Sequence, residues 1–407
     1  HVIQAPAIHR ALTYLLEHLP PQRHVVLTSR EDPQLPLARY RARGQLTELR
    51  AADLRFTAAE AAEFLSQAMG LSLSAEAIAA LETRTEGWIA GLQMAALSMQ
   101  GREDIAGFVR AFTGSHRYII DYLVEEVLQH QPDHVRNFLL ETSILEQFTG
   151  PLCEAVTGQT DGSARLQALE RANLFVISLD DQRQWHRYHH LFAEVLRARL
   201  RAEQPGHVPE LHRRASAWYA RHDLPLEAVR HALAAEDYEQ AAKLIELAWP
   251  AVARDRQDGV LRGWLKVLPD DQVRRRPVLS IYFAGALLTG GDLPAVEARL
   301  RDAERCLDLG KEAAAPAQPV EGELLVADLA ELRKLPAQIS IYRAALAQAR
   351  GDLTGTIAAA RQALDRVEAG DHLGHAGAAG FLGLSLWASG DVQAAQRTFA
   401  AAVTSMR

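Results

Sequence analysis

The sequence predicts a mostly α-helical protein with a short α/β segment at its start, then a helical segment, a winged helix and a superhelix of helical repeats. Three observations support this fold class. Apolar residues recur at helical spacing through most of the 407 residues. Short β-branched or alternating runs are confined to the segment 1–56 and to the segment 175–189. After Pro209, Gly-Asp pairs recur between small-residue helices.

Composition limits the classes of protein that this chain can be. A length of 407 residues suggests two to four domains. The net charge of −7 argues against strong binding to DNA by this chain alone, because phosphate neutralisation needs a basic surface. Two cysteines cannot form a disulfide framework or a four-thiolate zinc site, so we expect a cytoplasmic location. No apolar run is long enough to span a membrane, and we expect no membrane partner.

Residues 1–56 show the only α/β pattern near the start of the chain. A helical stripe over residues 5–19 is followed by a β-branched run at residues 25–27 and a second short strand at residues 46–49. This order is typical of the trailing half of a doubly wound domain. Two strands cannot form an independent sheet, so we expect the rest to lie upstream. His1 is not a methionine and no signal peptide follows it, which also suggests a longer protein.

Residues 57–117 read as a helical segment. Thr57 and Glu60 form a capping-box pattern at the start of a helix that Gly70 ends. Ser74 is placed to cap a second helix, which ends before Gly87. A buried helix should follow from Trp88 to Met99.

Residues 118–206 show the order of secondary-structure elements that is typical of a winged helix. Its helices are expected at residues 118–128, 135–145, 151–157, 163–172 and 191–202. Residues 175–179 read as a strand, a polar turn follows, and residues 185–189 alternate as the return strand. The order of helices, hairpin and closing helix is the basis of this assignment.

Residues 207–407 read as a superhelix similar to tetratricopeptide repeats. Gly-Asp pairs begin at Gly291, Gly351 and Gly390, and the spacing of the last two is near the length of one helix–turn–helix repeat. The earlier gap is longer, and it contains an expected inserted loop at residues 313–323. Three glycines at i, i+3 spacing predict a smooth helix face that a neighbouring helix can approach closely: Gly374, Gly377 and Gly380.

Candidate site residues have functional and structural readings that the sequence leaves open. The chain contains no Walker A pattern, no Rossmann glycine fingerprint and no nucleophile elbow. A metal site at His186, His189 and His190 lacks a carboxylate or cysteine to complete it, which favours packing or polar contacts. Arg30 follows a predicted strand, where open α/β sheets bind ligands, but it also fits an ordinary surface arginine.

Several stretches of this sequence resemble the large LuxR-type transcription regulators similar to MalT. The first is Leu27-Thr-Ser-Arg-Glu-Asp-Pro, and the second is Leu35-Pro-Leu-Ala-Arg-Tyr-Arg-Ala-Arg-Gly-Gln-Leu. Further matches are Thr85-Glu-Gly-Trp-Ile-Ala-Gly-Leu-Gln, Phe112-Thr-Gly-Ser-His-Arg and the winged-helix signature Arg187-Tyr-His-His-Leu-Phe. The resemblance covers essentially the whole chain.

The resemblance implies a signal-transduction ATPase with numerous domains (STAND). Members are built from a P-loop nucleotide domain, a winged helix, a tetratricopeptide-like superhelix and a C-terminal helix-turn-helix. The chain would then begin after the Walker B acidic residues and end within the superhelix. By this resemblance Arg30 is a sensor for the γ-phosphate, Gly87 and Trp88 lie near the adenine, and His189 or His190 holds the ADP phosphates. The chain lacks the proline of the family's Gly-x-Pro motif after Gly87.

The resemblance further implies a regulator core that couples an inducer at the helical repeats to a nucleotide-controlled switch. ATP or ADP with Mg would act in the complete protein, the active state would self-associate, and DNA would bind only through a domain absent here. We expect no catalytic site in this chain. The alternative reading is a non-catalytic helical-repeat scaffold for a protein partner, and dependence on nucleotide separates the two.

We predict that the 407-residue chain neither hydrolyses ATP nor binds it tightly. A P-loop supplies most protein contacts to the phosphates, and none is present in this sequence. Isothermal titration calorimetry of the purified chain should detect no binding in the micromolar range. A micromolar dissociation constant for ATP would contradict this prediction.

Overall fold

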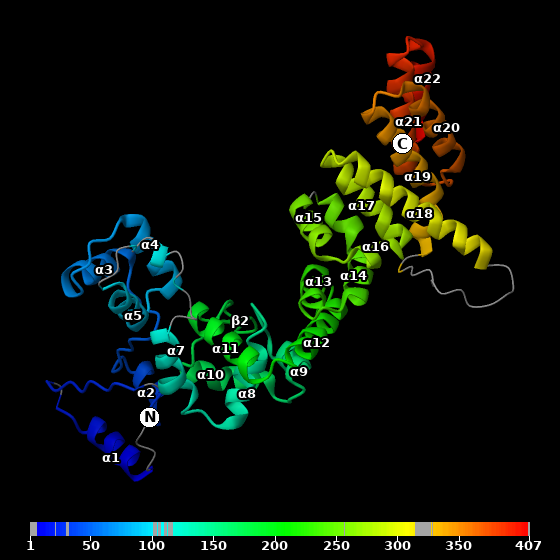
Figure 1. Ribbon diagram of the computed structural model, residues 1–407. Helices are drawn as coiled ribbons and strands as arrows, with labels where there is room; N and C mark the ends of the chain where they lie inside the picture. The colour runs from blue at the N-terminus through cyan, green and yellow to red at the C-terminus, as the bar shows by residue number, and fades with distance from the viewer. Residues whose placement is uncertain are drawn as a thin grey trace. The chain divides into compact units, whose positions relative to one another are not determined.

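The computed structural model describes residues 6–20, 22–29, 32–100, 104, 107–109, 112, 117–255, 257–313, 327 and 329–405. The chain divides into two compact units, residues 1–215 and 216–407, coloured from blue to green and from green to red in Figure 1. Helices dominate both units, and the described residues contain a single two-stranded sheet. The predicted mostly α fold class is confirmed. None of the described helices combines the length and apolarity that a membrane span requires.

The segment 1–56 contains helices α1 (Pro6–Glu17) and α2 (Leu37–Ala42). The two strands predicted at residues 25–27 and 46–49 are wrong, because neither segment joins a ladder among the described residues. Their apolar side chains are open to solvent, with Val26 86% and Leu49 72% exposed. A strand persists only when a neighbouring strand satisfies its amides and carbonyls, and no such neighbour lies beside these segments in the described part of the chain.

The helical segment begins as the sequence predicts. Thr57 Oγ1 accepts the amide of Glu60 at 3.3 Å, and Glu60 Oε2 accepts the amide of Thr57 at 2.9 Å, which completes the capping box. Helix α3 (Ala58–Glu63) continues into a π-helical turn, η1 (Phe64–Ala68). Ser74 caps α4 (Ala75–Thr85) through the amide of Ala77, and α5 (Ile89–Met99) follows.

The winged helix contains the predicted order of helices, hairpin and closing helix. Its strands β1 (Val176–Ser178) and β2 (His186–Tyr188) pair antiparallel, with Val176 opposite Tyr188. Phe148 adds an isolated bridge to His186 on the outer edge of β2. The helices are α7 (Arg117–Leu123), η2 (Val124–Leu128, π-helical), α8 (Asp133–Thr142), α9 (Gly150–Thr157), α10 (Gly162–Arg171) and α11 (His190–Glu203).

The boundary between the two units falls within α12 (Val208–Arg221). The second unit is a series of antiparallel helix pairs, as Figure 1 shows. Its further helices are α13 (Pro225–Ala234), α14 (Tyr238–Arg254), α15 (Asp258–Val267), α16 (Asp270–Arg274), α17 (Pro277–Thr289), α18 (Leu293–Ala313), α19 (Leu329–Ala349), α20 (Leu353–Arg366), α21 (His372–Ala388) and α22 (Val392–Ser405).

The recurring Gly-Asp pairs are the junctions between paired helices. Gly291, Gly351 and Gly390 adopt left-handed conformations, with φ of 78°, 77° and 89°. Each following aspartate caps the next helix: the carboxylate of Asp352 accepts the amide of Gly355 at 2.8 Å, and that of Asp391 accepts the amide of Ala394 at 3.0 Å. A left-handed residue ends one helix and an acidic cap begins the next, so the chain reverses within a few residues.

The smooth face predicted for Gly374, Gly377 and Gly380 is wrong. A Cβ at Gly377 would lie at an ordinary 3.8 Å from Ile341, and one at Gly380 would meet nothing within 4 Å. The close approach on α21 occurs instead at Gly383, where a Cβ would lie 2.6 Å from the Phe399 ring of α22. The i, i+3 spacing of the glycines does not show where along the helix the partner comes close. Here the close approach is one turn after Gly380, at Gly383. The loop expected at residues 313–323 lies outside the described residues, apart from Ala313.

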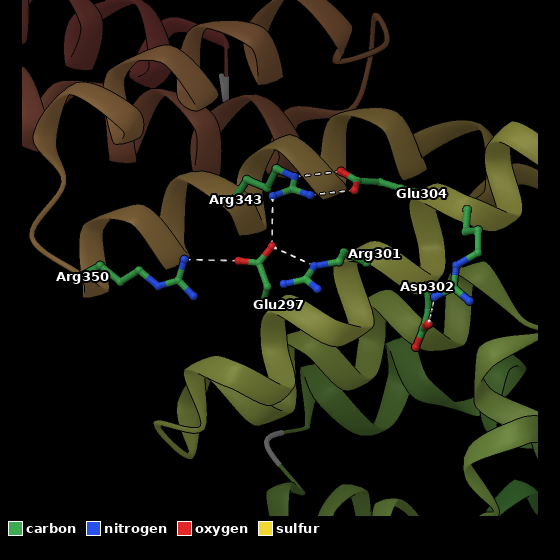
Figure 2. A network of polar contacts seen from close by, with 7 residues as sticks. Glu297, Arg301, Asp302, Glu304, Arg343 and Arg350 are labelled. Carbon is green, nitrogen blue, oxygen red and sulfur yellow. Dashed lines mark hydrogen bonds and ion pairs between the residues drawn. The ribbon is translucent and has the colours of Figure 1, made fainter.

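Helices α18 and α19 are joined by a network of ion pairs centred on Glu297 (Figure 2). Glu297 contacts Arg301 on its own helix at 3.4 Å, and it contacts Arg343 and Arg350 of α19 at 3.6 and 3.2 Å. Arg343 also donates two hydrogen bonds to Glu304. Burial raises the pKa of the Glu297 carboxyl, but the surrounding arginines outweigh it and hold that pKa below its usual value. The carboxylate therefore stays ionised and fixes α19 against α18.

We predict that Asp352→Ala lowers the free energy of unfolding of the second unit by about 1 kcal/mol, because an N-cap hydrogen bond to Gly355 is lost. Chemical denaturation followed by circular dichroism should measure the change. Gln362→Ala, at an exposed position of the same helix, is the control and should leave the midpoint almost unchanged. Equal stability of Asp352→Ala and the wild type would contradict a capping role.

Candidate functional site

The structure brings four of the five predicted site residues into one region. Gly87 and Trp88 belong to the segment Thr85–Trp88, which begins with the last residue of α4 and is hereafter called the 85–88 turn. His189 and His190 lie between β2 and α11. The two segments contact each other through hydrogen bonds and aromatic rings. Arg30, the fifth predicted residue, lies outside the described residues.

Two consecutive left-handed residues shape the 85–88 turn. Glu86 has φ of 49° and Gly87 has φ of 69°. Only a glycine fits the second position, because a Cβ there would lie 2.4 Å from the carbonyl oxygen of Phe56. The Phe56 amide donates to the Gly87 carbonyl at 2.9 Å and holds this close approach. The turn thus projects the Glu86 side chain toward the winged helix.

Glu86 forms a bidentate ion pair with Arg187 of β2. Arg187 Nη1 lies 2.8 Å from Glu86 Oε1, and Nη2 lies 2.9 Å from Oε2. The amide of His190, the first residue of α11, also donates to Glu86 Oε1 at 3.2 Å. Exposed amides at a helix N-terminus favour an anion, and in this structure the anion is the carboxylate of Glu86. Glu86 was not among the predicted site residues, although it lies within the family-matching stretch that begins at Thr85, because its partner Arg187 is 101 residues away in the sequence.

The ionisation of Glu86 follows from these contacts. Burial of the carboxyl raises its pKa, but the hydrogen bonds and charge of Arg187 and the hydrogen bond from the His190 amide outweigh that effect and lower the pKa to about 2. Arg55 adds a further positive charge, with Nη1 at 3.7 Å from Oε2. Glu86 therefore stays charged, and paired with Arg187, throughout the physiological pH range.

His189 is buried at the centre of the contact. Its Nε2 lies 2.8 Å from the carbonyl oxygen of Thr85, and since a carbonyl only accepts, Nε2 carries the proton. The ring also packs edge-on against Trp88 and Phe175, each at 5.9 Å between centroids. Burial lowers the pKa of His189, and the charge of Glu86 offsets this only in part. The ring is therefore neutral near pH 7.

The other two histidines occupy different environments. The His190 side chain is 63% exposed, and its Nε2 lies 3.6 Å from Glu86 Oε1. His186 is buried on β2, where its ring stacks on Phe148 at 6.4 Å. Across the described ranges, no group of three His, Cys, Asp or Glu side chains is arranged to hold a metal ion. The structure thus separates the three rings that the sequence placed in one cluster.

A cleft of about 950 Å³ lies beside the contact. Its walls come from residues 27–54 and from the winged helix, and Trp88, Tyr122 and Phe175 supply aromatic surface. The Trp88 ring contacts Phe175 at 5.2 Å and Tyr122 at 5.7 Å. Polar residues of the lining include Asp32 and Arg50. Trp88 therefore contributes both to the cleft and to the packing around His189.

The middle of the chain is similar to a domain of known proteins. Residues 124–208 match the MalT winged helix domain. The HTH-type transcriptional regulator MalT of Klebsiella pneumoniae is 35% identical over 287 residues, 70% of this chain and 32% of that protein. The serine/threonine-protein kinase PknK of Mycobacterium tuberculosis is 37% identical over 290 residues, 71% of this chain and 26% of that protein.

One solved structure overlaps more of the chain at lower similarity. It is a signal transduction ATPase with numerous domains (STAND) protein with a tetratricopeptide repeat sensor from Pyrococcus horikoshii. The two superpose with a TM-score of 0.46 at 14% identity, over 87% of this chain and 48% of that one. The chain spans about a third or less of the sequence relatives named above. The similarity to MalT that the sequence motifs predicted is therefore confirmed, in the winged helix and over 287 residues of the chain.

We predict that His189 makes the first unit less stable in mild acid. Because folding lowers the pKa of this ring, the unfolded chain takes up the proton first as the pH falls below about 6.5. The free energy of unfolding should therefore fall between pH 7 and pH 5 by more in the wild type than in His189→Gln, which retains an N–H donor and does not titrate. Denaturant titrations at each pH measure this difference. His134→Gln, an exposed position of α8, is the control, and identical pH profiles for the wild type and His189→Gln would refute the prediction.

Proposed function

We propose that this MalT-like chain is the switch and sensor core of a signal-responsive, ATP-dependent transcription regulator. The observation that carries the proposal is the double role of Trp88. The side chain lines the cleft and also packs against Phe175 and His189 of the winged helix. A ligand in the cleft and the docking of the winged helix would therefore both act on the same residue, as a two-state switch requires.

The residues present fit the base of a nucleotide better than its phosphates. A cleft of about 950 Å³ with aromatic walls is large enough for a nucleotide-sized ligand, and Trp88 and Gly87 would lie beside the base. ATP or ADP with Mg would supply the charged phosphates whose presence or loss changes the switch. His190 is the exposed donor at the start of α11 that could reach a phosphate, and Arg30 would sense the γ-phosphate. A P-loop from the complete protein would hold most of the phosphate contacts.

The second unit would serve as the sensor. Stacked helix pairs with short Gly-Asp junctions form an extended surface of the kind on which helical repeats bind ligands. An inducer at this surface and a nucleotide at the first unit would each favour one arrangement of the winged helix, which makes their effects reciprocal. The active arrangement would self-associate, and DNA would bind through a separate C-terminal domain of the complete protein.

The similarity to PknK favours one specific alternative. That relative is a kinase, and it shares with this chain a region of nearly the same length as MalT does. The module could therefore control an attached catalytic domain in place of a DNA-binding domain. A plain scaffold that binds a protein partner is the third reading. Dependence of the output on nucleotide distinguishes the scaffold from both switches, and the kind of output distinguishes the two switches.

In the complete protein we predict that His190→Ala raises inducer-independent transcription. Loss of a phosphate contact made only in the closed arrangement would weaken that arrangement, and a difference of ~1.4 kcal/mol shifts the equilibrium tenfold. His190 is exposed, so thermal stability should not change. Reporter output and binding of a fluorescent ADP analogue measure the effect. His134→Ala is the control, and unchanged reporter output with unchanged ADP affinity would exclude a nucleotide role for His190.

A further inference from the structure

The Glu86–Arg187 ion pair joins two parts of the first unit that are far apart in sequence. Glu86 ends α4 of the helical segment, and Arg187 lies on β2 of the winged helix, 101 residues later. The same contact also contains the hydrogen bond of His189 to Thr85, that of the His190 amide to Glu86, and the approach of His190 Nε2 to Glu86 at 3.6 Å. The Glu86 carboxylate therefore accepts from both the strand and the helix that follow each other in the winged helix.

We propose that Glu86 and Arg187 form a latch that holds the winged helix against the helical segment, and that its release is part of activation. This inference rests on the proposed switch function. The carboxylate acts as an internal ligand: it satisfies the guanidinium of Arg187 and the first amide of α11 at the same time. The winged helix cannot move away from the 85–88 turn unless both partners are given up together.

Because it is largely buried, this ion pair should contribute more to the stability of the contact than a surface ion pair would. The Glu86 side chain is only 9% exposed, and Arg187 is about one-quarter exposed. Surface pairs contribute little because water and salt screen them, whereas a bidentate pair shielded from water is screened less and fixed in geometry. If one partner is removed, the other is left charged and poorly solvated at the contact, so either single change should weaken docking. Arg55, His189 and His190 are the other positively charged or titratable groups beside the carboxylate.

A strained backbone conformation occurs on each side of the contact, and the Glu86–Arg187 pair helps to maintain both. Glu86 and Phe175 are both non-glycine residues in the left-handed region, with φ of 49° and 55°. Phe175 packs on Trp88 and His189, and its carbonyl accepts the His189 amide at 2.8 Å. Such conformations persist only while surrounding contacts maintain them. When the contact opens, the backbone of both residues can relax to negative φ. This gain in conformational energy would favour separation of the winged helix from the helical segment once the ion pair is broken.

The test measures one distance within the 407-residue chain, without nucleotide. Spin labels at Glu76→Cys on α4 and Gln182→Cys in the β1–β2 turn report the separation of the two parts by double electron–electron resonance. Both label positions are exposed. Cys153 is buried, which raises the pKa of its thiol and protects it from labelling, and Cys306→Ala removes the second native thiol. The otherwise wild-type chain should give one narrow distance distribution.

Glu86→Gln and Arg187→Gln should each move a major fraction of molecules to longer, broader distances. The control is Arg199→Gln, which removes an exposed ion pair with Glu203 on the same helix α11 and should leave the distribution unchanged. Wild-type distances in both latch variants, or an equal shift in the control, would overturn the proposal. Circular dichroism and the cooperativity of thermal unfolding show whether each variant is folded.

A conservative variant decides the outcome if the neutral substitutions unfold the contact region. Arg187→Lys keeps the charge but cannot form the bidentate pair. A folded Arg187→Lys protein with an intermediate open fraction supports the latch, and one with the wild-type distribution overturns it. Because the measurement uses no nucleotide, its result is independent of the reporter experiment on His190. Either proposal can therefore fail while the other stands.

Discussion

The left-handed turn at Glu86 and Gly87 is the constraint on which the arrangement of the first unit depends. It directs one carboxylate at Arg187 and the start of α11, and it leaves the Thr85 carbonyl facing His189. Trp88, next in the chain, then lies between the cleft and the aromatic residues of the winged helix. Four consecutive residues thus supply the charge, the acceptor, the close approach and the apolar surface of the contact.

The second unit follows a different principle. Its order comes from a repeated local junction, in which a left-handed residue ends one helix and an aspartate begins the next. Side-chain networks such as that around Glu297 add ion pairs between neighbouring helices. A repetitive series of helix pairs suits recognition, whereas the contact between the 85–88 turn and the winged helix joins distant parts of the first unit, which suits switching.

Much of the fold could be predicted because its signals are local. The capping box at Thr57, the hairpin at residues 175–189 and the Gly-Asp junctions each depend on residues a few positions apart. The strands at residues 25–27 and 46–49 could not be judged in this way, since a strand requires a partner that local pattern does not reveal. Glu86 was missed for a similar reason: its importance comes from Arg187, 101 residues away. His189 was placed in the right region, but its burial and hydrogen bond to Thr85 depend on tertiary packing.

The Gly-Asp junctions also bear on how the polypeptide acquires its structure during synthesis. Because each reversal is fixed by residues within one or two turns of it, a helix pair can close as soon as both of its helices have been made. The partner that completes the contact of Glu86, in contrast, is translated 101 residues later. The second unit can therefore fold progressively as it is synthesised, whereas the bidentate pair of the 85–88 turn cannot form until β2 has been made.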